Sequence, residues 1–160
     1  MSQDSTRDVL LPSILNRLID PDALGTSGRP WYGTEQLVSA VRRDVATLLN
    51  SRQTHQGLCD DYPQCARSLL AFGLPDPPSM EAHTSTQREA IARQIEHVVR
   101  QFEPRLSGVR ISLLEPFDER EQAVHYLIEA QLQVGSGPDI AFEVILDLTT
   151  GRYDTETRRA

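Results

Sequence analysis

Four carboxylates in this chain could do acid–base chemistry: Glu103, Glu115, Glu129 and Asp147. Cleavage of a glycosidic bond needs two carboxyl groups about 5 to 9.5 Å apart across a cleft. Arg105 lies two residues from Glu103 and favours its ionised form, which argues against a general acid there. Glu129 and Asp147 fall on strand faces that we expect to be solvated. With no Gly-x-Ser-x-Gly elbow, zinc signature or phosphate loop, the sequence indicates no enzyme.

The run Phe102-Glu103-Pro104-Arg105 offers recognition chemistry instead. Pro104 disfavours the helical conformation of the residue before it, so an upstream helix should end at Phe102 or Glu103. A carboxylate at that end faces the negative pole of the helix dipole and needs a compensating cation. If Pro104 holds the chain extended, Glu103 and Arg105 project to the same side and form a pair. From the residues alone, this pair fits either an intramolecular salt bridge or a docking site.

A second polar cluster comprises His55, Cys59, Asp60 and Cys65. Its spacing matches no common zinc pattern, so we expect neither a metal nor a cofactor. Two cysteines are too few for a disulfide framework and fit reduced thiols in a cytosolic protein.

Composition narrows the range of partners. The 160 residues carry a formal charge of -7, and all sixteen basic side chains are arginines. Nucleic acids and anionic membranes call for a basic face, so neither is the expected partner. The start of the chain does not resemble a secretory signal, and no apolar run is long enough to insert into a membrane.

Helical periodicity dominates the first two thirds of the chain. Residues 1–33 should form an amphipathic helix and an arm, with one apolar face made by Leu10, Leu11, Leu15 and Leu18. A second helix should run from Glu35 to Ser51 behind an N-cap at Thr34, and Arg42, Arg43 and Asp44 should lie on its solvated face. A short helix should follow Asp61-Tyr62-Pro63 and reach Leu70. Thr86 and Glu89 should form the capping box of the helix that leads to Phe102.

Alternating apolar residues dominate the last third. They run through Val109 to Leu113, Tyr126 to Val134 and Ile140 to Leu148, and the loop Gly135 to Asp139 is of hairpin type. The expected fold is therefore α+β: N-terminal helices followed by an antiparallel β-meander of three to four strands packed on the helices. Residues 34–160 should form a single domain, whose free sheet edge could accept a strand from another chain.

Four segments in order resemble the TssE family of type VI secretion baseplate subunits, which is related to the wedge protein of contractile phage tails. They are Leu10 to Leu18, Val38 to Asn50, Asp61 through Asp76, and Phe102 to Arg105. The resemblance spans nearly the whole chain. It departs from the family at Ala71, where an asparagine is frequent.

This resemblance implies a structural role in the cytoplasm, in a baseplate at the inner face of the bacterial inner membrane. It implies that Glu103, Pro104 and Arg105 dock onto the other wedge subunits, of TssF, TssG and TssK type, and that the sheet helps to nucleate the contractile sheath. The Leu10, Leu11, Leu15 and Leu18 face would be a helix-in-groove anchor, although packing onto the chain's own core fits its periodicity equally well.

Two other functions stay open. Phage relatives of the family carry a lysozyme-like label, which suggests a peptidoglycan-cleaving muramidase-like enzyme using the carboxylates above. A small regulatory anti-adaptor that binds a response regulator has the same fold, and fold alone does not determine function.

Overall fold

The computed structural model describes residues 33–53, 61–75, 82, 84–114, 122–134 and 137–156. Its elements are α2 (Thr34–Asn50), α3 (Pro63–Ala66), the 3₁₀ helix η1 (Leu69–Ala71), α4 (Ser85–Phe102), and strands β1 (Leu106–Leu113), β2 (Ala123–Leu132), β3 (Asp139–Asp147) and β4 (Tyr153–Glu156). The expected α+β fold is confirmed. The predicted helix and arm in residues 1–33, with Leu10, Leu11, Leu15 and Leu18, lie outside the described residues apart from Gly33.

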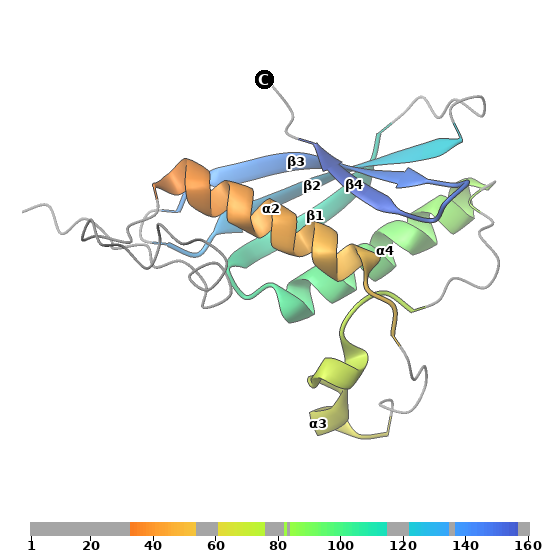
Figure 1. The fold of residues 1–160 in the computed structure, drawn as a ribbon, viewed down its shortest axis with the longest axis horizontal. Helices are drawn as coiled ribbons and strands as arrows, with labels where there is room; N and C mark the ends of the chain where they lie inside the picture. The colour runs from red at the N-terminus through yellow and green to blue at the C-terminus, as the bar shows by residue number, and fades with distance from the viewer. Residues whose placement is uncertain are drawn as a thin grey trace, which may run out of the picture.

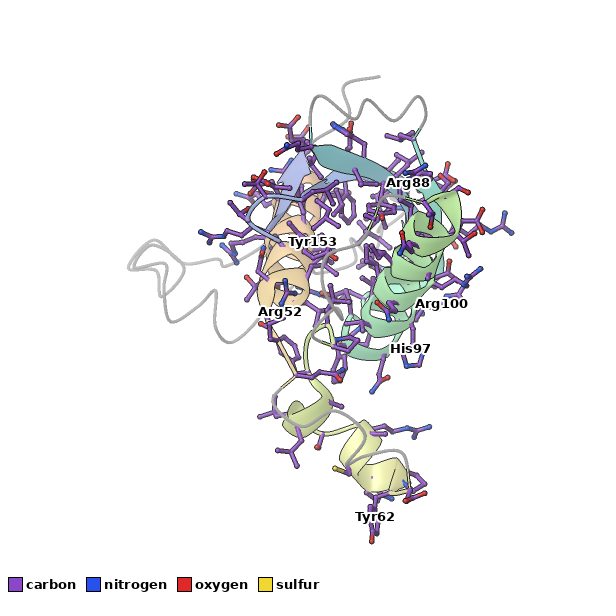
Figure 2. The ribbon with its side chains drawn as sticks, turned by 90° about the vertical axis from the view of Figure 1, so that its right-hand side faces the viewer. Arg52, Tyr62, Arg88, His97, Arg100 and Tyr153 are labelled. Atoms are coloured by element: carbon purple, nitrogen blue, oxygen red, sulfur yellow. The ribbon has the colours of Figure 1, made fainter. Side chains whose placement is uncertain are left out.

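The four strands form one antiparallel sheet in the order β1-β2-β3-β4. Alternate residues of β2 are buried, from Val124 through Tyr126 and Ile128 to Leu132, as the period-two pattern predicts. Figures 1 and 2 show α2 and α4 side by side on one face of this sheet. The core lies between that face and the two helices, and the opposite face carries no helix among the described residues.

Both long helices begin where a glutamine side chain binds the N-cap backbone. In α2 the N-cap is Gly33, whose N–H donates to Gln36 Oε1 at 3.0 Å, so the prediction of Thr34 is wrong by one residue. In α4 the capping box pairs Thr84 with Gln87. The predicted box of Thr86 and Glu89 is therefore wrong, because an equivalent Thr-x-x-Gln pattern lies two residues earlier and satisfies the same amides.

The segment between the long helices departs from the single helix that was expected. It is broken into α3 and η1, because the Ser68 hydroxyl accepts from Leu70 N–H and starts a separate 3₁₀ turn. Figure 1 shows α3 projecting away from the layered body. Gly73 ends the projection with φ +100°, and a Cβ there would lie 2.4 Å from Ser51 O, so this return to the end of α2 requires glycine.

Candidate functional site

The end of α4 forms a corner where the chain turns into β1. The helix ends at Phe102, as Pro104 predicts, and Glu103 is its C-cap. Arg105 Nε donates to Glu103 Oε1 at 2.6 Å, and its Nη2 also pairs with the other oxygen of the same carboxylate. The predicted pair of Glu103 and Arg105 is confirmed, but the extended chain expected at Pro104 is not: Leu106 N–H donates to Glu103 O at 3.1 Å, so the chain turns here. We call residues 103–105 the corner.

A third charged residue joins the corner from α2. Asp44 Oδ2 accepts from Arg105 Nη2 at 2.7 Å, so one guanidinium binds two carboxylates. The expectation that Asp44 lies on a solvated face is wrong, since 26% of its side chain is exposed. Sequence reasoning missed this contact because Asp44 and Arg105 lie 61 positions apart. The pKa of Arg105 is raised, first by its hydrogen bond to Glu103 and next, against the opposing effect of burial, by its hydrogen bond to Asp44.

The three corner residues differ in what a partner could reach. Glu103 is only 4% exposed and is the buried charged residue of the described core. Arg105 is partly exposed, with 29% of its side chain accessible, whereas Pro104 is exposed. Glu103 is therefore inaccessible to a partner, and its role is to hold the Arg105 side chain in place. Of the three corner residues, only Pro104 and Arg105 are accessible at the surface.

A hollow of about 320 Å³ opens beside the corner. Its apolar wall is formed by Leu48, Phe72 and Phe102, and the two phenylalanine rings meet edge to face with centroids 5.4 Å apart. Asp44 and all three corner residues complete the lining. The hollow thus combines an aromatic wall with a fixed cation at its rim, a combination found where proteins anchor a partner's side chain.

Exposed apolar side chains lie on the projection that leads to this hollow. Leu69 is 87% exposed, Leu70 48% and Tyr62 65%, and Figure 2 shows Tyr62 at the far tip. Phe72, which lines the hollow, follows η1 directly. Periodicity grouped Leu69 and Leu70 with a helical face and gave no sign of their exposure.

The described carboxylates considered for glycoside cleavage do not meet across a cleft. Glu103 is buried in its ion pairs. Glu129 and Asp147 both belong to the uncovered face, but Asp147 lies opposite Ala123, six residues along β2 from Glu129. At 3.3 Å per residue this separates them by roughly 20 Å, well beyond the spacing that either mechanism uses. Glu115 lies outside the described residues.

The second polar cluster falls mostly outside the described residues, which include only Cys65 of its members. Cys65 is disulfide-bonded, so the expectation of a free thiol at this position is wrong. The number of cysteines suggests whether a protein works in a reducing or an oxidising compartment. It does not reveal whether two particular cysteines lie close enough to form a disulfide. Groups of three or more possible metal ligands are absent from the described part of the chain. Within the same part, the search for a helix able to cross a membrane also found none.

Comparisons with known proteins give one family. The model of the family described as baseplate wedge protein gp25 matches residues 35–136. No curated protein matches significantly. A chain in a solved structure titled "The baseplate complex from the type VI secretion system" is 16% identical, with a TM-score of 0.48, and the match covers 70% of this chain and 95% of that one.

Proposed function

Because the chain belongs to the baseplate wedge protein gp25 family, we propose that it is a structural subunit of a type VI secretion baseplate and docks onto wedge subunits of TssF, TssG and TssK type through its corner. The family is one of structural baseplate components. The observation that carries the docking proposal is the hollow beside Pro104 and Arg105.

The corner has the rigidity that docking requires. Glu103 and Asp44 hold the Arg105 guanidinium from two sides, so little side-chain entropy is lost when a partner binds it. Phe72 and Phe102 supply a preformed apolar wall. A partner side chain with an apolar body and a hydrogen-bond acceptor at its tip would match both features.

The sheet supports a second proposed role, which is to help nucleate the contractile sheath. Its four strands form an open antiparallel sheet with β1 and β4 at the ends of the strand order. Another chain could add a strand at such an edge through backbone hydrogen bonds. Because backbone hydrogen bonds do not depend on side chains, each subunit that joins the sheath could pair with the one before it in the same way. We place the assembled protein in the cytoplasm, in a baseplate at the inner face of the inner membrane.

Co-purification from cells that assemble the secretion system tests this function. The tagged full chain should bring down wedge subunits and sheath subunits in the same complex. Pro104→Ala should reduce recovery of wedge subunits at least five-fold, because it alters the exposed rim of the hollow without touching the ion pairs. The matched control is Arg93→Gln, which changes an arginine that is 70% exposed on α4.

Each alternative function predicts a different result, in the co-purification or in an activity assay of the purified chain. Recovery of a response regulator without baseplate subunits would favour the anti-adaptor. Turnover of peptidoglycan by the purified chain would favour the muramidase-like enzyme. Equal recovery of wedge subunits by Pro104→Ala, Arg93→Gln and the unsubstituted chain would refute docking through the corner.

A further inference from the structure

The projection, residues 61–73, carries all the large apolar side chains that are exposed among the described residues. They are Tyr62, Leu69 and Leu70. Single exposed leucines are common on protein surfaces, but these three side chains share one segment that stands clear of the core (Figure 1). A group of exposed apolar side chains of this kind indicates a contact with another molecule.

Side-chain amides hold the projection to both long helices. Gln53, which follows α2, donates from Nε2 to Ala71 O at 2.9 Å and to Gly73 O at 3.0 Å. Gln101 of α4 donates to Ala66 O. These bonds fix the backbone of the projection without burying its leucines. The leucines are therefore presented in a defined position, which lowers the entropy lost when a partner binds them.

Leu69 continues the apolar wall of the hollow beside the corner. Phe72 N–H donates to Leu69 O at 3.2 Å, which closes a 3₁₀ turn. Side chains three residues apart lie on the same side of such a turn, so Leu69 and Phe72 share one surface. Phe72 in turn meets the ring of Phe102 in the wall of the hollow. We call Leu69, Leu70 and Phe72 the strip.

An accessible cation lies at the outer end of the strip. Arg67 precedes Leu69 by two residues and is exposed. It forms no hydrogen bond or ion pair with the described residues. The projection's other charged residue, Asp61, comes directly before Tyr62, which Figure 2 shows at the far tip. A carboxylate on a partner would therefore complement the charge of Arg67.

The inner end of the strip has different chemistry. Arg105 lies there, at the rim of the hollow, and its Nε and Nη2 bind the carboxylates of Glu103 and Asp44. Its Nη1 has no hydrogen-bond partner among the described residues. Two carboxylates already balance this guanidinium, so a third would be repelled. An uncharged acceptor, such as a backbone carbonyl or a side-chain amide, suits the remaining N–H groups.

We propose that the strip docks an apolar segment of a wedge subunit. The segment places a carboxylate at Arg67 and an uncharged hydrogen-bond acceptor at Arg105, and its apolar side chains cover Leu69, Leu70 and Phe72. One partner segment thus spans the corner and the projection. The identity of the partner rests on the function proposed above, whereas the extent of the surface rests on the exposed leucines and their continuity with the hollow.

Leu69→Gln tests the strip, and Leu69→Met is the matched control. The two new side chains have nearly the same shape, but only methionine keeps the surface apolar. Because Leu69 is 87% exposed, neither change alters the core. Titration calorimetry with the purified complex of TssF-type and TssG-type subunits measures the affinity of each full-length variant. We expect Leu69→Gln to lower the affinity at least ten-fold and Leu69→Met to lower it less than two-fold.

Arg67→Glu tests the charge at the outer end. The affinity should fall at least five-fold at about 0.05 M salt and by a smaller factor at about 0.5 M, because salt screens exposed charges. Arg93→Glu makes the same change in net charge on α4 and should bind normally. Equal losses for the two variants would contradict a carboxylate at Arg67.

The outcomes separate this inference from the proposed function. Normal affinity of Leu69→Gln, together with weak binding by Pro104→Ala, would overturn the strip and leave docking through the corner standing. An unsubstituted chain that does not bind the wedge complex would overturn both.

Hydroxyl-radical footprinting of the full chain identifies the occupant. Leu69 should be oxidised readily in the isolated chain and protected in the wedge complex. Protection in the isolated chain at every concentration would assign the strip to another part of the same chain. Protection only at high concentration would assign it to a second copy. Either result would overturn the inference.

Discussion

Arg105 binds Asp44 across 61 residues of sequence, with its Nη2 2.7 Å from Asp44 Oδ2. The contact ties the exit of α4 to the middle of α2. Because the same guanidinium also holds the buried Glu103, one side chain serves both the fold and the surface that we propose for docking.

Arg105→Ala should destabilise the isolated domain, because it leaves the Glu103 carboxylate buried without its cation. Removal of one member of a buried pair costs about 3 to 5 kcal/mol, and the partial exposure of Arg105 lowers our expectation to about 2 kcal/mol. Urea denaturation monitored by circular dichroism measures the change.

Pairing Arg105→Ala with Glu103→Gln provides the control for this effect. The double variant has no buried charge, so it should recover part of the stability that Arg105→Ala loses. Strictly additive losses in this double-mutant cycle would contradict the coupling between the two residues.

Asp44→Asn should have a milder effect than Arg105→Ala. It removes one of two carboxylates from a partly exposed arginine, so we expect a loss of about 0.5 to 1 kcal/mol. Arg105 would also lose its tether to α2, and affinity for wedge subunits should fall two- to five-fold. Titration calorimetry with the purified wedge complex measures the affinity, with Arg93→Gln as the control. Unchanged affinity would mean that Asp44 does not position Arg105 for docking.

The double substitution Glu96→Ala and Arg100→Ala should open the β1 edge, because alanine can neither accept from Ile111 N–H nor donate to Val109 O. Stability should change by less than about 1 kcal/mol, because both side chains are partly exposed. The Ile111 amide should exchange faster, and the chain should self-associate at lower concentration. Hydrogen exchange and sedimentation velocity measure the two effects. A variant that stays monomeric, with an Ile111 amide as protected as in the unsubstituted chain, would show that the pair does not close this edge.

Alkaline pH should destabilise the domain although all its basic side chains are arginines, which keep their charge below about pH 12. Burial raises the pKa of Tyr153 to about 12 and also raises the pKa of Tyr126. Since tyrosine in the unfolded chain titrates near pH 10, this stability is complete below about pH 10 and is lost as the pH rises toward 12.

Denaturation midpoints at about pH 8 and about pH 11 measure this loss. From the lower to the higher pH, the denaturation midpoint of Tyr153→Phe should fall by less than that of the unsubstituted chain. An equal loss would exclude Tyr153 as a source of the pH dependence.

Local patterns in the sequence determine much of this fold. Alternation identified the inner face of β2, and Pro104 located the end of α4. The pairing of Glu103 with Arg105 was also predicted correctly, although a turn and not an extended chain brings the two side chains together. The expected relation to the wedge proteins of contractile phage tails is confirmed by the family match over residues 35–136.

Contacts between distant segments could not be read from the sequence. Neither the binding of Asp44 to Arg105 nor the blocking of β1 by Glu96 and Arg100 follows from spacing, because both depend on how helices pack beside the sheet. The burial of Glu103 arises in the same way. It changes the role of that residue from one that a partner could touch to one that fixes Arg105.

The central claim is that Pro104 and Arg105 face wedge subunits in the assembled baseplate. Photo-cross-linking with a benzophenone amino acid in place of Pro104 tests it most directly, and the same amino acid in place of Arg93 serves as the control. We predict cross-links from position 104 to TssF-type or TssG-type subunits and none from position 93. An assembled baseplate in which position 104 forms no cross-link to any wedge subunit would contradict the claim.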